Sequence, residues 1–260
     1  ARWRRKPVVM NLSLARNALA ILLLLGAAGC GLFESEETRI PGERISVLSL
    51  DRELEPDQRI ADLQVRLPRP ADTASWLMSG GNASHALHHV AIPATITQAW
   101  RTNIGEGSDS TMRLLATPIV VDGKVYTMDV ESQITALNAA NGDILWQQDL
   151  KVPDDDDEAF GGGLAYNNGR LFISTGFADV LSLDADTGKE LWRTRLSGPM
   201  RAAPTVNGNR VFVITIDNQL FALNADTGER NWTHSGFAEV AGLLGGASPA
   251  VGDGAVIVPY

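Results

Sequence analysis

The 260-residue sequence contains a single cysteine, Cys30, so no disulfide bond can form within the chain. It also lacks a long apolar run: the apolar core at residues 19–25 is far shorter than the roughly 20 residues that cross a bilayer. No part of the sequence shows a sustained helical period, which excludes α/β solenoids. The sequence therefore predicts a chain without internal covalent cross-links, membrane-spanning runs or repeated helices.

Positive charge is scarce beyond the first 30 residues. Five of the 22 Lys and Arg residues precede Cys30, and none of the 31 Asp and Glu residues does. The remainder therefore carries 17 basic against 31 acidic residues, a net charge of −14. Such a surface repels phosphate backbones, so nucleic acid is not an expected partner.

Residues 1–30 have the order of an export signal. A basic start is followed by the apolar stretch at 19–25 and by the small residues 27–29 directly before Cys30. This order predicts a signal peptide with a lipobox, cleaved to leave a lipid-modified Cys30 that anchors the chain to a membrane. An ordinary signal beside a free thiol is the alternative. Gly31 stands where an inner-membrane retention signal usually has Asp, which favours the periplasmic face of the outer membrane.

Residues 31–74 are rich in Glu, Asp, Arg and Pro, a composition that predicts a tether. Residues 75–260 are different, because they repeat. One signature occupies residues 138–146, 184–192 and 224–232, and each copy has a glycine at its fifth position and a tryptophan at its ninth. The glycines are Gly142, Gly188 and Gly228, and the tryptophans are Trp146, Trp192 and Trp232, with Trp100 ending an earlier, degenerate copy.

The interval between successive tryptophans is 46, 46 and 40 residues, and each interval holds the same order of parts. A strand of small residues leads through an Asn-Gly or Asp-Gly turn into an apolar strand, then into an alternating strand such as 219–223, and finally into the signature. Four strands in about 40 to 45 residues predict a β-propeller of four-stranded antiparallel blades, with about four blades present.

The repeated residues have a predicted structural role. A tryptophan at the end of the fourth strand can wedge between neighbouring blades while its indole N–H finds a backbone acceptor. The glycine of the signature gives the sharp turn that aims it. We therefore predict blade-docking roles for the four tryptophans and the three glycines.

The pattern Ala-Leu-(Asn/Asp)-Ala-x-(Thr/Asn)-Gly-x-x-x-Trp resembles the tryptophan-docking repeat of propellers of the pyrroloquinoline-quinone (PQQ) type. Together with the lipobox, the acidic tether and residues 76–82, it resembles the BamB-like family of outer-membrane assembly lipoproteins. Members of that family have an eight-bladed ring. Because residues 256–260 fall in the second strand of the fourth blade, the resemblance implies a truncated chain with an exposed edge.

The resemblance implies a non-catalytic periplasmic scaffold without a cofactor. Its implied partners are the BamA-like periplasmic domains of the barrel-assembly protein and unfolded outer-membrane proteins. The loop at 237–246 would then be a docking loop, with Val240, Leu243 and Leu244 as candidate contacts; the alternative is that these side chains belong to the core. The competing function is a PQQ-dependent dehydrogenase, but such enzymes stack their cofactor on a vicinal disulfide, which one cysteine cannot form.

Other candidate sites are weak. Residues 154–158 are acidic but lack the spacing and central glycine of a calcium loop, so they predict a solvated connection between blades. His85, His88 and His89 have no cysteine or carboxylate set that would complete a zinc site. Ser110, Thr111 and His234 form no recognisable nucleophile arrangement. The sequence therefore predicts neither a metal site nor catalytic residues.

Overall fold

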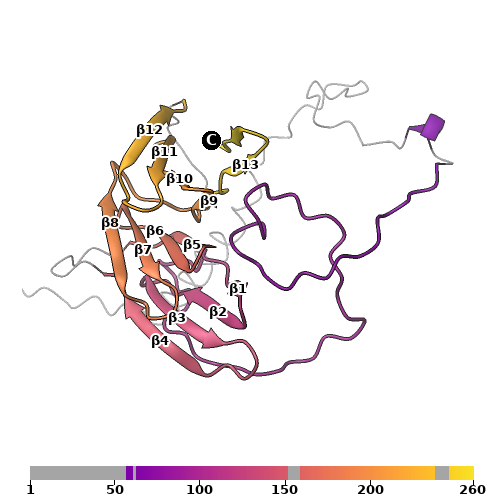
Figure 1. The fold of residues 1–260 in the computed structure, drawn as a ribbon, viewed down its shortest axis with the longest axis horizontal. Coiled ribbons are helices and arrows are strands. Elements are labelled where there is room, and N and C mark those ends of the chain that lie inside the picture. Colours follow the sequence, from indigo (N-terminus) through magenta and orange to yellow (C-terminus); the bar gives the residue numbers. More distant parts are fainter. Residues whose placement is uncertain (1–56, 61–62, 152–158, 238–245) are drawn as a thin grey trace, which may run out of the picture. The chain divides into compact units, whose positions relative to one another are not determined.

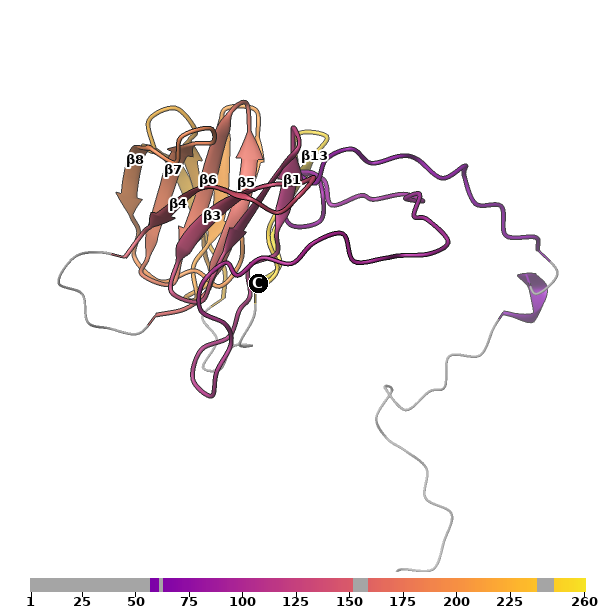
Figure 2. The same cartoon turned by 90° about the horizontal axis from the view of Figure 1, so that it is seen from below.

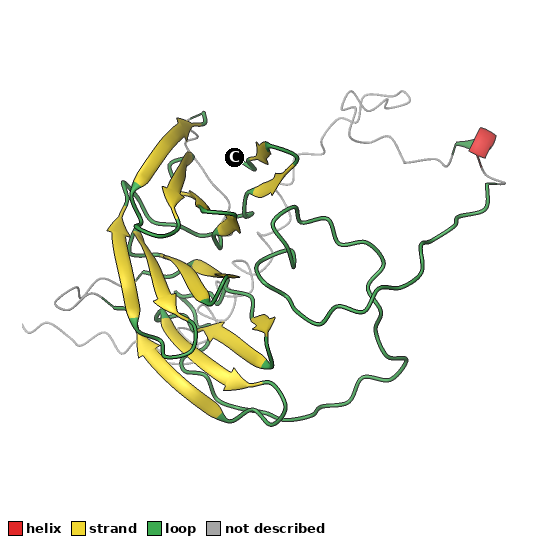
Figure 3. Cartoon of the chain, viewed as in Figure 1, coloured by secondary structure: helices red, strands yellow, loops and turns green. Residues whose placement is uncertain are grey.

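The computed structural model describes residues 57–60, 63–151, 159–237 and 246–260 (Figure 1). The chain divides into two compact units, Ala1–Gln64 and Val65–Tyr260. The first unit contains the 3-10 helix η3 (Gln58–Ile60), drawn red in Figure 3. In the described ranges, no helix has the length and apolar character needed to cross a membrane.

The second unit is built from antiparallel strands in four sheets. The strands are β1 (Ile119–Val121), β2 (Lys124–Met128), β3 (Gln133–Asn138), β4 (Ile144–Asp149), β5 (Gly162–Asn167), β6 (Arg170–Thr175), β7 (Asp179–Asp184), β8 (Glu190–Arg195), β9 (Thr205–Asn207), β10 (Arg210–Ile214), β11 (Gln219–Asn224), β12 (Arg230–Ser235), β13 (Ala250–Gly252) and β14 (Ala255–Ile257). Three sheets have four strands each, in the orders β1-β2-β3-β4, β5-β6-β7-β8 and β9-β10-β11-β12, and β13 pairs with β14. The prediction of four-stranded antiparallel blades is confirmed, with three complete blades and a two-stranded fourth.

Tight turns join the first two strands of each blade. Asp122 and Gly123 both have positive φ (50° and 73°), as do Asn168 and Gly169 (47° and 77°). Positive φ at both central residues is the geometry of a type I′ turn, which matches the twist of the flanking strands. The Asn-Gly and Asp-Gly pairs of the sequence therefore fix the register of β1 with β2 and of β5 with β6.

The middle strands of the three complete blades are largely buried on both faces. Leu171 of β6 belongs to the core between the first and second blades, whereas its neighbour Phe172 belongs to the core between the second and third. Leu220 and Phe221 of β11 are 2% and 3% exposed. The strand expected at residues 219–223 therefore has core on both sides, because each face of the blade packs against a different neighbour.

The blades are arranged with their first strands on one side and their last strands on the other. Figure 1 shows β1, β5, β9 and β13 on the inner side and β4, β8 and β12 along the outer side. Figure 2, turned by 90°, shows the sheets standing one behind another. A third core, including Phe212, Ile214 and Val251, joins the third blade to β13 and β14.

Residues 65–118 lead into β1 mostly as coil, drawn green in Figure 3. Two isolated β-bridges attach this segment to the blades, Trp76 to Val120 and Met78 to Ala165. We call residues 76–83 the inner strap, because they contact the first strands of the blades.

Candidate functional site: blade junctions and the outer rim

Each of three tryptophans binds the turn that precedes the fourth strand of a following blade. Trp100 lies in the coil before β1, Trp146 in β4 and Trp192 in β8. The hydrogen bonds run from Trp100 Nε1 to the carbonyl oxygen of Ala139 (2.9 Å), from Trp146 Nε1 to that of Ala185 (3.1 Å) and from Trp192 Nε1 to that of Ala225 (3.0 Å). The partly buried indoles therefore have their polar edge satisfied by backbone of the adjoining blade.

The glycine of each turn lies against the indole ring. Gly188 has φ of +72°, and a Cβ built on it would lie 2.7 Å from Cε3 of Trp146. Gly142 (φ +77°) and Gly228 (φ +74°) have the same relation to Trp100 and Trp192, with Cβ distances of 2.6 Å. Sequence reasoning assigned these glycines to the sharpness of the turn alone. The close approach of the indole is a second reason for glycine.

Ion pairs reinforce two of these junctions. Lys124, the first residue of β2, pairs with Asp186 in the turn of the second blade, and Arg170, the first residue of β6, pairs with Asp226 in the turn of the third. The hydrogen bond from Arg170 holds the pKa of Asp226 below its usual range. Sequence reasoning missed these pairs, although a basic residue directly follows the turn glycines Gly123 and Gly169, and an aspartate stands two places before Gly188 and Gly228.

A buried aromatic ring supports each tryptophan of the blades. Tyr126, Phe172 and Phe212 occupy equivalent positions in the second strand of their blades, and their centroids lie 6.0, 6.1 and 6.0 Å from those of Trp146, Trp192 and Trp232. The hydroxyl of Tyr126 also donates to the carbonyl oxygen of Ala185 (3.0 Å). Burial raises the pKa of this phenol far above its ordinary value.

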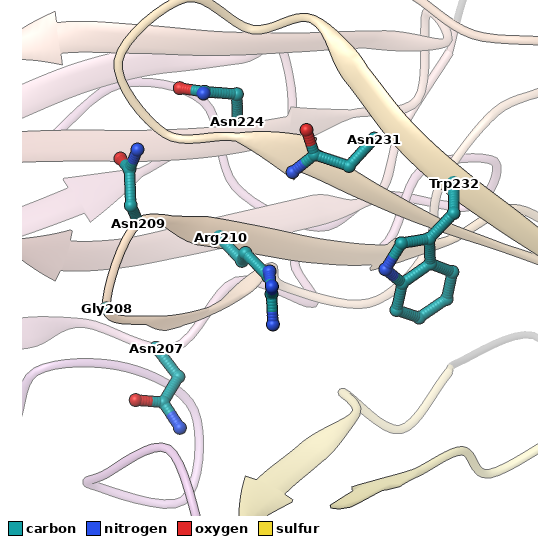
Figure 4. A pocket seen from close by; sticks show the side chains of 7 residues that line it. All are labelled: Asn207, Gly208, Asn209, Arg210, Asn224, Asn231 and Trp232. Atoms are coloured by element: carbon teal, nitrogen blue, oxygen red, sulfur yellow. The ribbon is translucent and has the colours of Figure 1, made fainter. Parts of the chain in front are cut away.

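The third blade presents the same elements, with Trp232 in β12 and Arg210 in β10. Trp232 is 39% exposed, and no described residue accepts a hydrogen bond from its indole. It lines a cavity of about 630 Å³ with Arg210 of β10, which is the counterpart of Lys124 and Arg170 (Figure 4). The other lining residues are Asn207, Gly208, Asn209, Asn224 and Asn231.

The outer rim consists of the fourth strands, which stand at the edges of their sheets. Ile144 and Leu145 at the start of β4 are each 47% exposed, and Leu191 at the start of β8 is 48% exposed. β8 carries Glu190, Arg193 and Arg195, charges of the kind that protect an edge strand, whereas Asp149 is the one charged residue of β4. The edge of β4 is therefore more apolar and less protected than the edge of β8.

A smaller cavity of about 190 Å³ lies beside the β2–β3 turn and is lined by several acidic residues. The carboxylate of Asp129 accepts backbone N–H groups of Glu106 (2.9 Å), Glu131 (3.0 Å) and Gln133 (2.8 Å). Asp129 thereby holds the turn and the coil of residues 105–106 together.

The weaker candidates are dispersed. His89 contacts the carbonyl oxygen of Pro68 (2.9 Å), and His234 contacts the hydroxyl of Tyr260 (2.6 Å). Burial lowers the pKa of His85. Thr111 donates to Asp109 in a local turn. In the part of the chain that the structure describes, no group of three or more His, Cys, Asp or Glu residues could hold a metal ion.

Several predicted positions lie outside the described residues. These are Cys30, the acidic run at 154–158, and the candidate contacts Val240, Leu243 and Leu244.

The repeating part of the chain matches a known protein family. The family model described as outer membrane protein assembly factor BamB matches residues 85–156 and 130–260. The chain belongs to the BamB family. It is 33% identical over 172 residues to the BamB of Alteromonas naphthalenivorans, covering 61% of this chain and 41% of that protein.

Quinoproteins share the repeat. The dehydrogenase subunit of the quinone alcohol dehydrogenase of Acetobacter aceti is 32% identical over 130 residues, which cover 45% of this chain and 17% of that protein. The crystal structure of the quinohemoprotein alcohol dehydrogenase of Comamonas testosteroni has a TM-score of 0.50 at 24% identity, covering 63% of this chain and 27% of that chain. This structural likeness concerns the fold alone. Among curated relatives, the chain spans about two fifths of the BamB from Alteromonas.

Proposed function

We propose that the chain is a non-catalytic scaffold of the outer-membrane β-barrel assembly machinery, anchored by lipid on Cys30 to the periplasmic face of the outer membrane. The observation that carries this proposal is membership of the BamB family, whose description names outer-membrane protein assembly. The proposed partners are the periplasmic domains of a BamA-like barrel-assembly protein and unfolded outer-membrane proteins. No cofactor is part of the proposal.

The blade junctions suit a scaffold. Trp146 and Trp192 tie successive blades through hydrogen bonds, and Lys124 and Arg170 add ion pairs across the same junctions. Blades fixed in this way hold their outer strands at constant spacing, so a partner meets a preformed surface and little conformational entropy is lost on binding.

The outer rim supplies the binding mode. β4 stands at a sheet edge with the exposed apolar residues Ile144 and Leu145. A partner segment can extend such a sheet through backbone hydrogen bonds, while exposed apolar side chains add buried area. We propose the edge of β4 as the partner-binding edge, and Val240, Leu243 and Leu244 as further contacts.

Affinity capture tests the proposal. A tagged chain is expressed in an envelope-containing host, and bound proteins are identified after mild extraction. We expect recovery of the barrel-assembly protein, reduced at least several-fold by Leu145→Asp. The control is Ile257→Asp, because Ile257 is also exposed (71%) but lies on β14, away from the outer rim.

The competing function is a PQQ-dependent dehydrogenase, which the similarity to the Acetobacter aceti subunit supports. PQQ-dependent reduction of a dye with an alcohol or sugar, together with no captured assembly protein, would favour the enzyme over the scaffold. Capture of the assembly protein without dye reduction is the result that we expect.

A further inference from the structure

The inner strap is bound to three blades through its main chain. Trp76 and Val120 of β1 exchange two backbone hydrogen bonds, of 2.7 and 2.8 Å. The N–H of Tyr166 in β5 donates to the carbonyl oxygen of Leu77 (2.7 Å). Further along, the N–H of Val251 in β13 donates to the carbonyl oxygen of Ala83 (2.6 Å). The strap therefore covers donors and acceptors of the first strands as an added peptide would.

The strap also places side chains in preformed sites. Met78 is 3% exposed and belongs to the core that contains Ala165 and Phe172. Leu77 packs against both the first and the second core. Main-chain bonds to strand edges combined with a buried side chain are the features of peptide recognition by strand addition. We call the surface beneath Trp76, Leu77 and Met78 the inner groove.

The strap is separable from the blades that it covers. The ladders of β1 with β2 and of β5 with β6 are complete without it. Its extended part is short, because the N–H of Gly81 donates to the carbonyl oxygen of Met78 (2.8 Å) and turns the chain away. The preceding residues 66–74 are exposed, and among them Ala71 forms an isolated bridge with Val90, outside the blades. Loss of the strap would thus open the inner groove and leave the blades paired.

We propose that the inner groove is a peptide-binding site that the strap fills in cis, and that an extended apolar segment of an unfolded partner displaces the strap. The inference rests on the proposed function, since unfolded outer-membrane proteins expose extended segments with regularly placed apolar residues. Methionine is an unbranched, adaptable side chain, so the pocket of Met78 can accept other long apolar residues. A tethered strap competes at a high effective concentration, which makes occupancy by a partner reversible.

The test uses the strap itself as a probe. In the full chain, residues 76–83 are replaced by a Gly-Ser sequence of equal length, and a fluorescent peptide of residues 74–85 is titrated in by anisotropy. We expect saturable binding that is at least ~10-fold tighter than to the unchanged chain, because the cis competitor has gone. A peptide with Met78→Asp should bind at least ~10-fold more weakly, because it would bury a charge.

The inference is overturned if the replaced chain keeps its β-sheet circular dichroism and does not bind the peptide, or binds both peptides equally. Should the replaced chain not fold, a reversible lock gives the same readout. Met78→Cys with Ala165→Cys, in a Cys30→Ser background, places two cysteines across an existing β-bridge. Reduction should then raise peptide affinity at least ~10-fold by freeing the strap; an unchanged affinity overturns the inference.

The experiments distinguish failure of the inner-groove inference from failure of the proposed scaffold function. Capture of the assembly protein by a chain that cannot bind the strap peptide contradicts the inner groove alone. Binding of the strap peptide by a chain that captures no assembly protein supports the inner groove and contradicts the scaffold.

Discussion

The indole of Trp146 lies over the α-carbon of Gly188 in the next blade, where any other residue would carry its Cβ. Three residues before this glycine, the carbonyl oxygen of Ala185 accepts the indole N–H. The indole of Trp146 therefore contacts the adjoining turn in two ways: its ring packs against Gly188, and its N–H donates to the carbonyl oxygen of Ala185. This relation recurs at Trp100 and Trp192, which makes it the repeating unit of blade assembly.

Removal of a docked tryptophan should destabilise the protein. Trp146→Ala loses a large apolar surface and leaves the carbonyl of Ala185 with one donor fewer, so we expect a loss of roughly 3 kcal/mol in the free energy of unfolding. Trp232→Ala is the matched control, because Trp232 is more exposed and its indole has no described acceptor. Urea denaturation of both variants gives the comparison, and equal losses would contradict the docking role.

Comparing Gly188→Ala with Gly169→Ala separates the cost of the contact with Trp146 from the cost of backbone strain at a positive φ. The substitution forces a Cβ against Trp146 at a positive φ, so we expect a cost of about 2–4 kcal/mol from overpacking and strain combined. Gly169→Ala has similar φ (+77°) and no atom within 4 Å of the added Cβ. It should cost about 1–2 kcal/mol, the strain alone. If thermal or chemical unfolding gives the same loss for both, the contact with Trp146 is unimportant.

Tyr126→Phe should be mild, because Phe172 and Phe212 occupy the equivalent positions of the other blades. It removes the hydrogen bond to Ala185, worth about 0.5–1.5 kcal/mol. In alkaline titration followed by phenolate absorbance, the phenol of Tyr126 should stay protonated through the pH range in which exposed tyrosines ionise, since burial raises its pKa. Variant and parent should therefore titrate alike in that range. A lost ionisation step near pH 10 would place Tyr126 in solvent.

Stability should fall in acid partly through Asp226. Its folded pKa is lowered by the hydrogen bond from Arg170, so its contribution is present above the unfolded pKa of about 3.9 and is lost as pH falls through the folded pKa. Asp226→Asn should show a smaller fall in the urea midpoint between pH 5 and 3. Asp253→Asn removes the same charge from an exposed turn and serves as the control. If the urea midpoints of the two variants fall in parallel as the pH is lowered, a stabilising interaction between Arg170 and Asp226 is contradicted.

The sequence predicted the blades because their determinants are local. Asp122-Gly123 and Asn168-Gly169 set the hairpin turns, and the spacing of Trp146 and Trp192 sets the period. The second reason for Gly188 was not predictable from one turn, because the indole that requires it comes from the preceding blade. Burial of residues 220–223 on both faces likewise depends on two neighbouring blades, which the sequence of a single strand does not reveal.

The site was less predictable than the fold. The pairs of Lys124 with Asp186 and of Arg170 with Asp226 join residues 62 and 56 positions apart, which only an alignment of repeats would suggest. Residues 76–82 of the inner strap contribute to the family resemblance, yet the contacts of the strap with β1 and β5 are tertiary and follow no local pattern. The exposure of Leu145 and Leu191 was not predicted, because apolar residues beside a tryptophan are ordinarily assigned to a core.

The most direct test of the scaffold is site-specific photocrosslinking in intact cells. A photoreactive amino acid is placed at Leu145 on the outer rim or at Ile257 on β14, two exposed apolar positions. The account predicts a crosslink to the barrel-assembly protein from position 145 and none from position 257. A crosslink from 257 with none from 145 would contradict it.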